Sequence, residues 1–292
     1  MSVSLRVINN EVVKAIKHKT DKDEEDKRPF KGYKLFPVES KTNLPSIFLC
    51  AKKRSGKTSA IFKIIKSCCD KHTVLVIFSS TYDKDKNWTA IRKYCKHQHI
   101  QIEPHTALND EGVDILDIYV KRFKKEAEEK RLAEEEISDD ESEEEPLENL
   151  MFPESDSDDE PRKRKSKYWT PPFFFIFDDM SSELKAPSVS AFLKVHRHYA
   201  MCLFSSQWCH DLKPESLKQI DYWLLWKSFT EEKLVKLYKD CDLSIPFDLF
   251  MKMYKMATGP PYSFFYINAR EEDFRMNFNV EFDVEQVKQQ MI

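Results

Sequence analysis

Glycine is scarce in this chain: it occupies four of the 292 positions, where average usage would give about twenty. That scarcity argues against a glycine-rich dinucleotide fold, a collagen-like repeat and a flexible linker protein. Long apolar runs are also missing. No stretch approaches the roughly 18 apolar residues of a membrane helix, and the charged N-terminus lacks the apolar core of a signal peptide. We therefore expect a soluble, intracellular protein with no membrane partner.

The sequence has no Cys-x-x-Cys pair, which weakens the case for a structural metal. Its seven cysteines are odd in number and mostly lie in apolar segments, so we expect free buried thiols in a reducing compartment. Cys95, His97 and His99 are close enough in sequence to ligate a metal. A surface loop between a helix and a strand explains them equally well, and we favour the loop.

The net charge of −3 hides a strong asymmetry. Residues 134–160 hold fifteen Asp or Glu and no Lys or Arg, so the rest of the chain carries +12. The basic run PRKRKSK follows at 161–167, and we expect a disordered insertion over 126–167. Its basic run would serve nuclear import, phosphate contacts or only solvation. Acidophilic kinases favour serines followed by acids, namely Ser138, Ser142, Ser155 and Ser157.

Short, wholly apolar segments alternate with amphipathic ones along most of the chain. We expect strands at 46–51, 73–78, 99–102, 173–177, 201–204, 222–226 and 262–267. Helices are expected at 58–69, 88–94, 113–136, 183–196, 213–220, 231–240 and 247–256. Wholly apolar strands are typical of a sheet covered on both faces. The pattern predicts an α/β fold with a mostly parallel sheet between helix layers.

The first strand runs directly into AKKRSGKT at residues 51–58 and then into a helix. This is the phosphate-binding pattern G-x-x-x-x-G-K-[ST] with alanine at its first position. Backbone N–H groups would cradle phosphates, Lys57 would reach the β and γ phosphates, and the Thr58 hydroxyl would ligate Mg²⁺. The expected nucleotide-binding residues are Ala51, Lys52, Lys53, Arg54, Ser55, Gly56, Lys57, Thr58 and Ser59. Ala51 departs from the motif and has to take a negative φ.

Carboxylates follow the strand FFFIF at residues 173–177. In a parallel sheet they emerge at the edge that also holds the phosphate loop. Asp178 is the expected Mg²⁺ ligand, acting through the water shell of the ion, and Asp179 is expected to orient or deprotonate the attacking water.

Two further residues flank the strand at 201–204. Gln207 follows it in SSQ, where an amide would hold a water near the γ-phosphate or simply begin a helix. Arg197 precedes it in RHY, at the opposite edge of the sheet. An arginine there is out of reach of its own nucleotide, but in a ring it would face the neighbour's nucleotide as a finger in trans. The alternative is an ordinary surface arginine.

Taken together, these motifs, with FFYIN and FRMNF near the C-terminus, resemble the FtsK/HerA-type DNA-packaging ATPases of large eukaryotic DNA viruses, virophages and Maverick/Polinton-like elements, a group that includes the poxvirus-type enzymes. The resemblance covers about residues 44–280. It implies an oligomeric ring motor that hydrolyses ATP with Mg²⁺ to drive double-stranded DNA into a preformed capsid. Nucleotide and catalytic roles carry over to Lys57, Thr58, Asp178, Asp179 and Gln207, and also to Arg197.

The same resemblance implies viral capsid or portal proteins as partners and an infected eukaryotic host cell as the location, in a viral factory or nucleus or with the virion. We expect an N-terminal extension over 1–40, a P-loop ATPase domain over 41–282 and a C-terminal tail over 283–292. Two alternatives share the phosphate loop. One is a small-molecule or nucleoside kinase, and the other is a DNA-binding scaffold that holds ATP without turnover.

Overall fold

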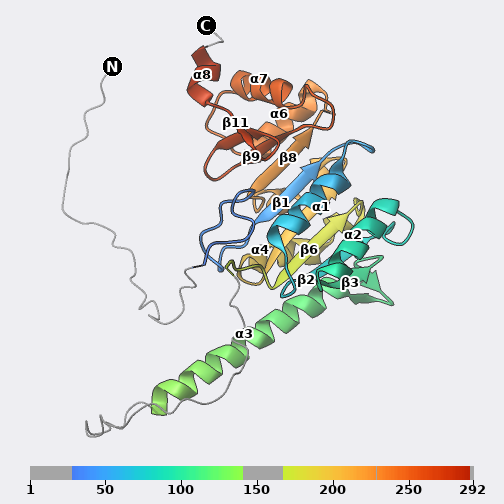
Figure 1. Cartoon of the computed structure of the whole chain (residues 1–292), viewed down its shortest axis with the longest axis vertical. Coiled ribbons are helices and arrows are strands. Elements are labelled where there is room, and N and C mark those ends of the chain that lie inside the picture. Colours follow the sequence, from blue (N-terminus) through green and yellow to red (C-terminus); the bar gives the residue numbers. More distant parts are fainter. Residues whose placement is uncertain (1–27, 141–166, 228, 290–292) are drawn as a thin grey trace, which may run out of the picture.

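A computed structural model describes residues 28–140, 167–227 and 229–289. Ser138 lies in a helix, while Ser142, Ser155, Ser157 and most of the basic run fall outside the described residues. The described chain is built on one nine-stranded sheet with helices on both faces (Figure 1).

The sheet has the strand order β11-β10-β9-β8-β1-β7-β6-β2-β3. From β3 to β8 neighbouring strands are parallel, while β9, β10 and β11 are antiparallel to their neighbours. This confirms the predicted, mostly parallel sheet. Its strands are β1 (Ser46–Cys50), β2 (Val74–Ser79), β3 (Gln101–His105), β6 (Phe173–Asp178), β7 (Ala200–Ser206), β8 (Tyr222–Trp226), β9 (Phe264–Asn268), β10 (Asp273–Met276) and β11 (Val280–Glu281).

Alternate residues of each central strand enter two separate apolar cores. In β1, Ile47 and Leu49 pack with helices α1 (Lys57–Cys68) and α2 (Lys86–His97). Phe48 and Cys50 point to the other face. That face is covered by α3 (Ile115–Asp140), α4 (Pro187–Val195), α6 (Glu231–Asp240) and α7 (Phe247–Ala257). Because both faces are covered, the strands are apolar throughout, as the sequence pattern required.

The structure differs from the expectations in local detail. Residues before α3 form a small hairpin, β4 (Asn109–Asp110) with β5 (Val113–Asp114), so the helix begins later than residue 113. It continues to Asp140, so the first part of the 126–167 segment is helical. The expected helix at 183–196 divides into η1 (Glu183–Lys185), α4 and η2 (His196–His198). The expected helix at 213–220 shortens to α5 (Pro214–Leu217), which follows η3 (Cys209–Asp211).

Packing also extends past the expected domain limits. Phe30 and Phe36 are buried, so the described part of the N-terminal segment covers the sheet. Gly32 permits this approach, because a Cβ there would lie 2.4 Å from Cys68 Sγ. At the other end, α8 (Val284–Gln289) buries Val287 and accepts a hydrogen bond from Lys252 Nζ to the Val287 carbonyl at 3.3 Å. The folded body therefore includes residues that the sequence assigned to extension and tail.

Candidate nucleotide-binding site

The loop between β1 and α1 has the backbone of an anion cradle. Arg54 and Gly56 both adopt left-handed conformations, with φ of 63° and 99°, and α1 begins directly after Gly56. Successive N–H groups in such a turn point toward one concavity at a helix N-terminus. Ala51 keeps an ordinary negative φ and donates its N–H to the Ser206 carbonyl at 3.0 Å. The alanine that departs from the motif is therefore accommodated without backbone strain.

A cavity of about 750 Å³ opens over this loop, a size typical of small-ligand sites. Eight of the nine expected nucleotide-binding residues line it, from Lys52 to Ser59. Ala51 does not, because it is fully buried beneath the loop. Lys63, Asp85 and Asn87 also contribute to the wall. Lys52, Lys53, Arg54, Lys57 and Lys63 give the cavity a high positive charge, which suits a polyphosphate.

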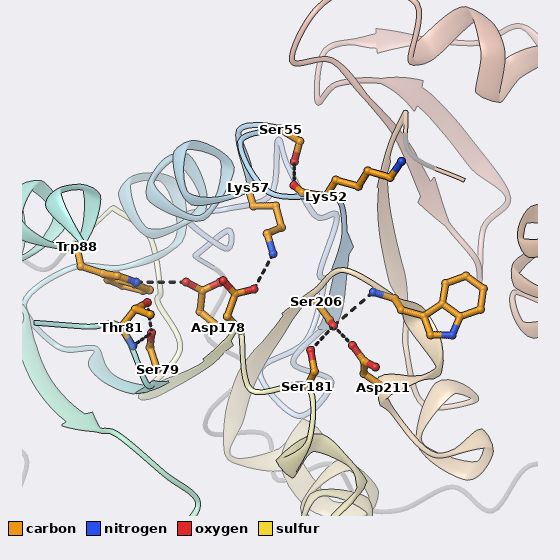
Figure 2. Close-up of polar contacts among 12 residues, drawn as sticks. Lys52, Ser55, Lys57, Ser79, Thr81, Trp88, Asp178, Ser181, Ser206 and Asp211 are labelled. Carbon is orange, nitrogen blue, oxygen red and sulfur yellow. Dashed lines mark hydrogen bonds and ion pairs between the residues drawn. The ribbon is translucent and has the colours of Figure 1, made fainter. Parts of the chain in front are cut away.

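Of the two carboxylates that follow the apolar part of β6, Asp179 is the one that lines this cavity. Its Oδ1 lies 3.0 Å from Lys57 Nζ, an ion pair that joins the start of α1 to the end of β6 (Figure 2). Asp179 has a φ of 53°, uncommon for a residue with a side chain. Its own N–H donates to the Ser205 carbonyl at 3.2 Å. The turn after β6 is therefore held in a left-handed conformation that directs the Asp179 carboxylate toward the phosphate loop.

Asp178 lies behind Asp179 at the end of β6, and only 5% of its surface is exposed. Its Oδ2 accepts a hydrogen bond from Trp88 Nε1 at 3.2 Å, as Figure 2 shows. Burial raises the pKa of Asp178 and the adjacent Asp179 charge adds to the rise, whereas the Lys57 charge and the Trp88 hydrogen bond oppose it. The structure thus brings both predicted carboxylates to the phosphate loop but gives them different surroundings.

Ser206, rather than Gln207, organises the end of β7. Its hydroxyl donates to Asp211, lies 3.2 Å from the Ser181 hydroxyl and accepts from the Trp208 N–H at 3.4 Å (Figure 2). Gln207 is exposed and does not line the cavity. Its predicted water-holding role remains a prediction.

Arg197 lies in η2, directly before β7. Because β7 is parallel to β1, Arg197 is at the N-terminal ends of these strands, opposite the phosphate loop at their C-terminal ends. Its Nη2 donates to Gln219 Oε1 at 3.3 Å. It lines a separate surface cavity with Asp221 and Arg270. Arg197 therefore does not line the nucleotide cavity of its own chain.

An aromatic wall completes the nucleotide cavity, and sequence reasoning missed it. Its members are Trp226, Tyr262, Phe264 and Phe278. Tyr262 is 75% exposed, and a Cβ on Gly56 would lie 3.8 Å from it. Tyr262 and Phe264 are two residues apart, but Trp226 and Phe278 come from other segments, so no spacing in the sequence marks the four as a group. Their proximity to the loop follows from the antiparallel pairing of β8 with β9.

Among the described residues, Cys95, His97 and His99 do not form a metal-binding group, and the seven cysteines are free and buried. Cys95 faces the core while His97 and His99 are exposed. The same part of the chain contains no helix with both the length and the hydropathy needed to cross a bilayer.

Comparison with protein-family models gives no match, and comparison with curated proteins gives none either. Among solved structures, the chain is similar to the genome packaging NTPase B204 of Sulfolobus turreted icosahedral virus 2 in complex with AMP. The two sequences are 12% identical, the match covers 80% of this chain and 96% of the B204 chain, and the TM-score is 0.47. The complex of the same protein with ATP-gammaS has 14% identity, 81% and 97% coverage and a TM-score of 0.45.

A third similar structure is B204, the DNA-packaging ATPase from Sulfolobus turreted icosahedral virus. It has 14% identity, 80% and 97% coverage and a TM-score of 0.46. At such identities the likeness concerns the course of the backbone. The chemistry of the site has to come from this chain's own residues.

Proposed function

We propose that this chain hydrolyses ATP at the cavity over residues 51–58 and uses the energy to translocate double-stranded DNA into a viral capsid. The observation that carries the hydrolytic part is the Lys57–Asp179 contact of 3.0 Å. It joins Lys57, the cation that would bind phosphate, to a carboxylate able to orient water. Both lie at the C-terminal ends of the parallel strands, where α/β proteins bind ligands.

The residues present fit a magnesium nucleotide. Thr58 supplies a hydroxyl and Asp178 a carboxylate, the hard oxygen ligands that Mg²⁺ prefers, directly or through its waters. When bound, Mg²⁺ would neutralise charge developing on the β and γ phosphates. The basic wall and the left-handed turn at Arg54 and Gly56 would hold the phosphate oxygens, and the aromatic wall would receive the base by stacking.

In this proposal Asp179 exchanges partners during the cycle. In this structure it pairs with Lys57, and the arrival of a triphosphate would give Lys57 a stronger anionic partner. Asp179 is then free to accept a hydrogen bond from a water and to align it with the γ-phosphate. The Trp88 donor meanwhile keeps Asp178 oriented.

The motor part of the proposal rests on the motif resemblance and on the +12 charge outside residues 134–160. A basic body attracts DNA through phosphate neutralisation and counterion release. We propose a homo-oligomeric ring, with capsid or portal proteins as partners, inside an infected eukaryotic host cell.

Arg197 would act in trans in such a ring. It lies at the sheet edge opposite its own phosphate loop, so a neighbour's nucleotide is the one it can reach. Rings mixed from wild-type and Arg197→Ala subunits would lose more activity than the mutant fraction accounts for. A loss proportional to that fraction would remove Arg197 from the mechanism.

The deciding experiment measures ATP turnover by the purified full chain with and without double-stranded DNA. We expect stimulation by DNA, and we expect Lys57→Ala to lower turnover at least about 100-fold, the loss typical of one transition-state donor. Lys71→Ala, an exposed lysine in the turn after α1, is the matched control. Turnover indifferent to DNA but dependent on a small acceptor would identify a kinase. ATP binding without turnover would identify a scaffold.

A further inference from the structure

Three side chains with metal-binding atoms converge away from the nucleotide cavity. Cys209 and His210 belong to η3, just after β7, and Asp240 is the last residue of α6. Their sulfur, ring nitrogen and carboxylate oxygen all lie within 4.8 Å of one another. Within the described ranges this is the one group of three such residues.

Two polar atoms of this group make no hydrogen bond. His210 Nε2 and Asp240 Oδ2 are both inaccessible to solvent and make no hydrogen bond. They face each other at 3.5 Å, beyond the usual range of a hydrogen bond. Buried polar atoms are nearly always satisfied, so two unsatisfied atoms beside a buried thiol indicate a missing shared partner.

We propose that Cys209, His210 and Asp240 form a zinc site. A zinc ion lies about 2.0–2.1 Å from nitrogen and oxygen ligands and about 2.3 Å from sulfur. At tetrahedral angles the nitrogen and oxygen would be about 3.3 Å apart, close to the observed 3.5 Å. A mixed sulfur, nitrogen and oxygen set suits Zn²⁺ and not Mg²⁺ or Ca²⁺, which take oxygen ligands.

The site lies close to the surface. The His210 and Asp240 side chains are 33% and 25% exposed, although Nε2 and Oδ2 themselves are covered, and Cys209 is fully buried. A small movement of either exposed side chain would admit an ion, and a water would fill the fourth position. A thiol binds zinc as the thiolate, so zinc binding at Cys209 would release a proton.

Neighbouring side chains already hold the His210 ring. Trp208 packs against it with ring centroids 4.9 Å apart, and Lys233 of α6 lies 4.5 Å from the centroid of Trp208. This packing restricts the orientations open to the imidazole ring. A zinc ion here would join η3 to the end of α6, and so restrain the segment that begins at Ser206 and Gln207.

Metal content and cobalt spectroscopy of the full chain test this proposal. After Zn²⁺ is added and excess removed by gel filtration, we expect one equivalent retained by the wild type. Co²⁺ should give the intense visible bands of a tetrahedral site together with a thiolate charge-transfer band. Both signals should be lost in Asp240→Asn and in Cys209→Ser. Asp242→Asn, an exposed neighbour, and Cys95→Ser, a buried cysteine elsewhere, should retain them.

Thermal unfolding provides the second readout, because a ligand that binds only the folded state raises Tm. Zinc should raise the Tm of the wild type and of Asp242→Asn, and should leave Asp240→Asn unchanged. The proposal is overturned if the wild type retains no zinc, or if Asp240→Asn and Cys209→Ser retain as much as the controls. Neither readout requires ATP turnover, so the outcome is independent of the proposed motor activity.

Discussion

Lys57 Nζ and Asp179 Oδ1 are 3.0 Å apart although 122 residues separate them in the chain. The contact occupies the lysine that the phosphates of a nucleotide would need. In the proposed cycle, nucleotide binding would therefore begin with an exchange of partners, and the strength of the ion pair would set how much the exchange costs.

Replacing Asp179 with asparagine should separate binding from turnover. Without the carboxylate Lys57 is free, so a non-hydrolysable ATP analogue should bind up to about fivefold more tightly, since partly exposed pairs contribute about 0.2–1 kcal/mol. Turnover should fall at least about 100-fold. Calorimetric binding and steady-state turnover check the two effects. Asp83→Asn, which removes an exposed acid paired with Arg92, should change neither, and tighter binding there would mean that net charge alone is responsible.

Replacing Trp88 with phenylalanine should move the pH profile of turnover. Burial already raises the pKa of Asp178, and loss of the Trp88 donor removes a bond that favours the ionised form. The acidic limb of the turnover-against-pH curve should shift to higher pH. Turnover should therefore fall most below neutrality and less at alkaline pH. The matched control is Trp223→Phe, because the buried Trp223 Nε1 has no hydrogen-bond partner. Equal shifts in both variants would trace the effect to packing.

Removing the Tyr262 ring should weaken nucleotide binding selectively. Tyr262 is 75% exposed and has a φ of 61°, so it adds little to the core. Stacking on a base is worth about 1–3 kcal/mol, and Tyr262→Ala should therefore weaken ATP binding about tenfold or more. Binding of inorganic triphosphate should stay unchanged, which assigns the effect to the base. Tyr33→Ala, at another exposed tyrosine, should affect neither ligand.

His196 should make the fold sensitive to acid. It is fully buried, and burial lowers its pKa to about 4. Between pH 6.5 and 4 the unfolded chain binds a proton at this residue that the folded chain does not, so stability falls as pH falls. The loss between pH 7 and pH 5 should be about 2 kcal/mol.

Urea unfolding at the two pH values measures this loss. His196→Asn should lessen it, whereas His72→Asn, at an exposed histidine, should not. If His196→Asn and the wild type lose the same amount, the acid sensitivity arises elsewhere.

The sequence predicted the central part of this molecule because buried parallel strands are strong local signals. Five apolar residues before Asp178, and a strand leading into the phosphate loop, were sufficient to place both at one sheet edge. It did not show which carboxylate faces Lys57, because the left-handed turn at Asp179 depends on its surroundings. Nor did it show the aromatic wall, which joins Trp226 and Phe278 to Tyr262 and Phe264, or the approach of Asp240 to Cys209 and His210, because these contacts join segments that are distant in sequence.

Edge elements were the least predictable. Strand β10 is short and only partly buried, and the two residues of β11 are exposed, so these strands lack the continuous apolar run that identifies an interior strand. The packing of residues 28–44 depends on Gly32 fitting beside Cys68. A single glycine has no local pattern that would reveal such a contact.

Helix α3 carries its C-terminal end away from the folded body. Phe123 is its last buried residue before a run of exposed positions, and the helix leaves the body as a single rod (Figure 1). At 1.5 Å per residue, Asp140 lies about 25 Å beyond Phe123. The Debye length at physiological salt is about 8 Å, so a charge at that end is separated from the body by about three screening lengths. Electrostatic effects of that end would then fall mainly on molecules outside this chain.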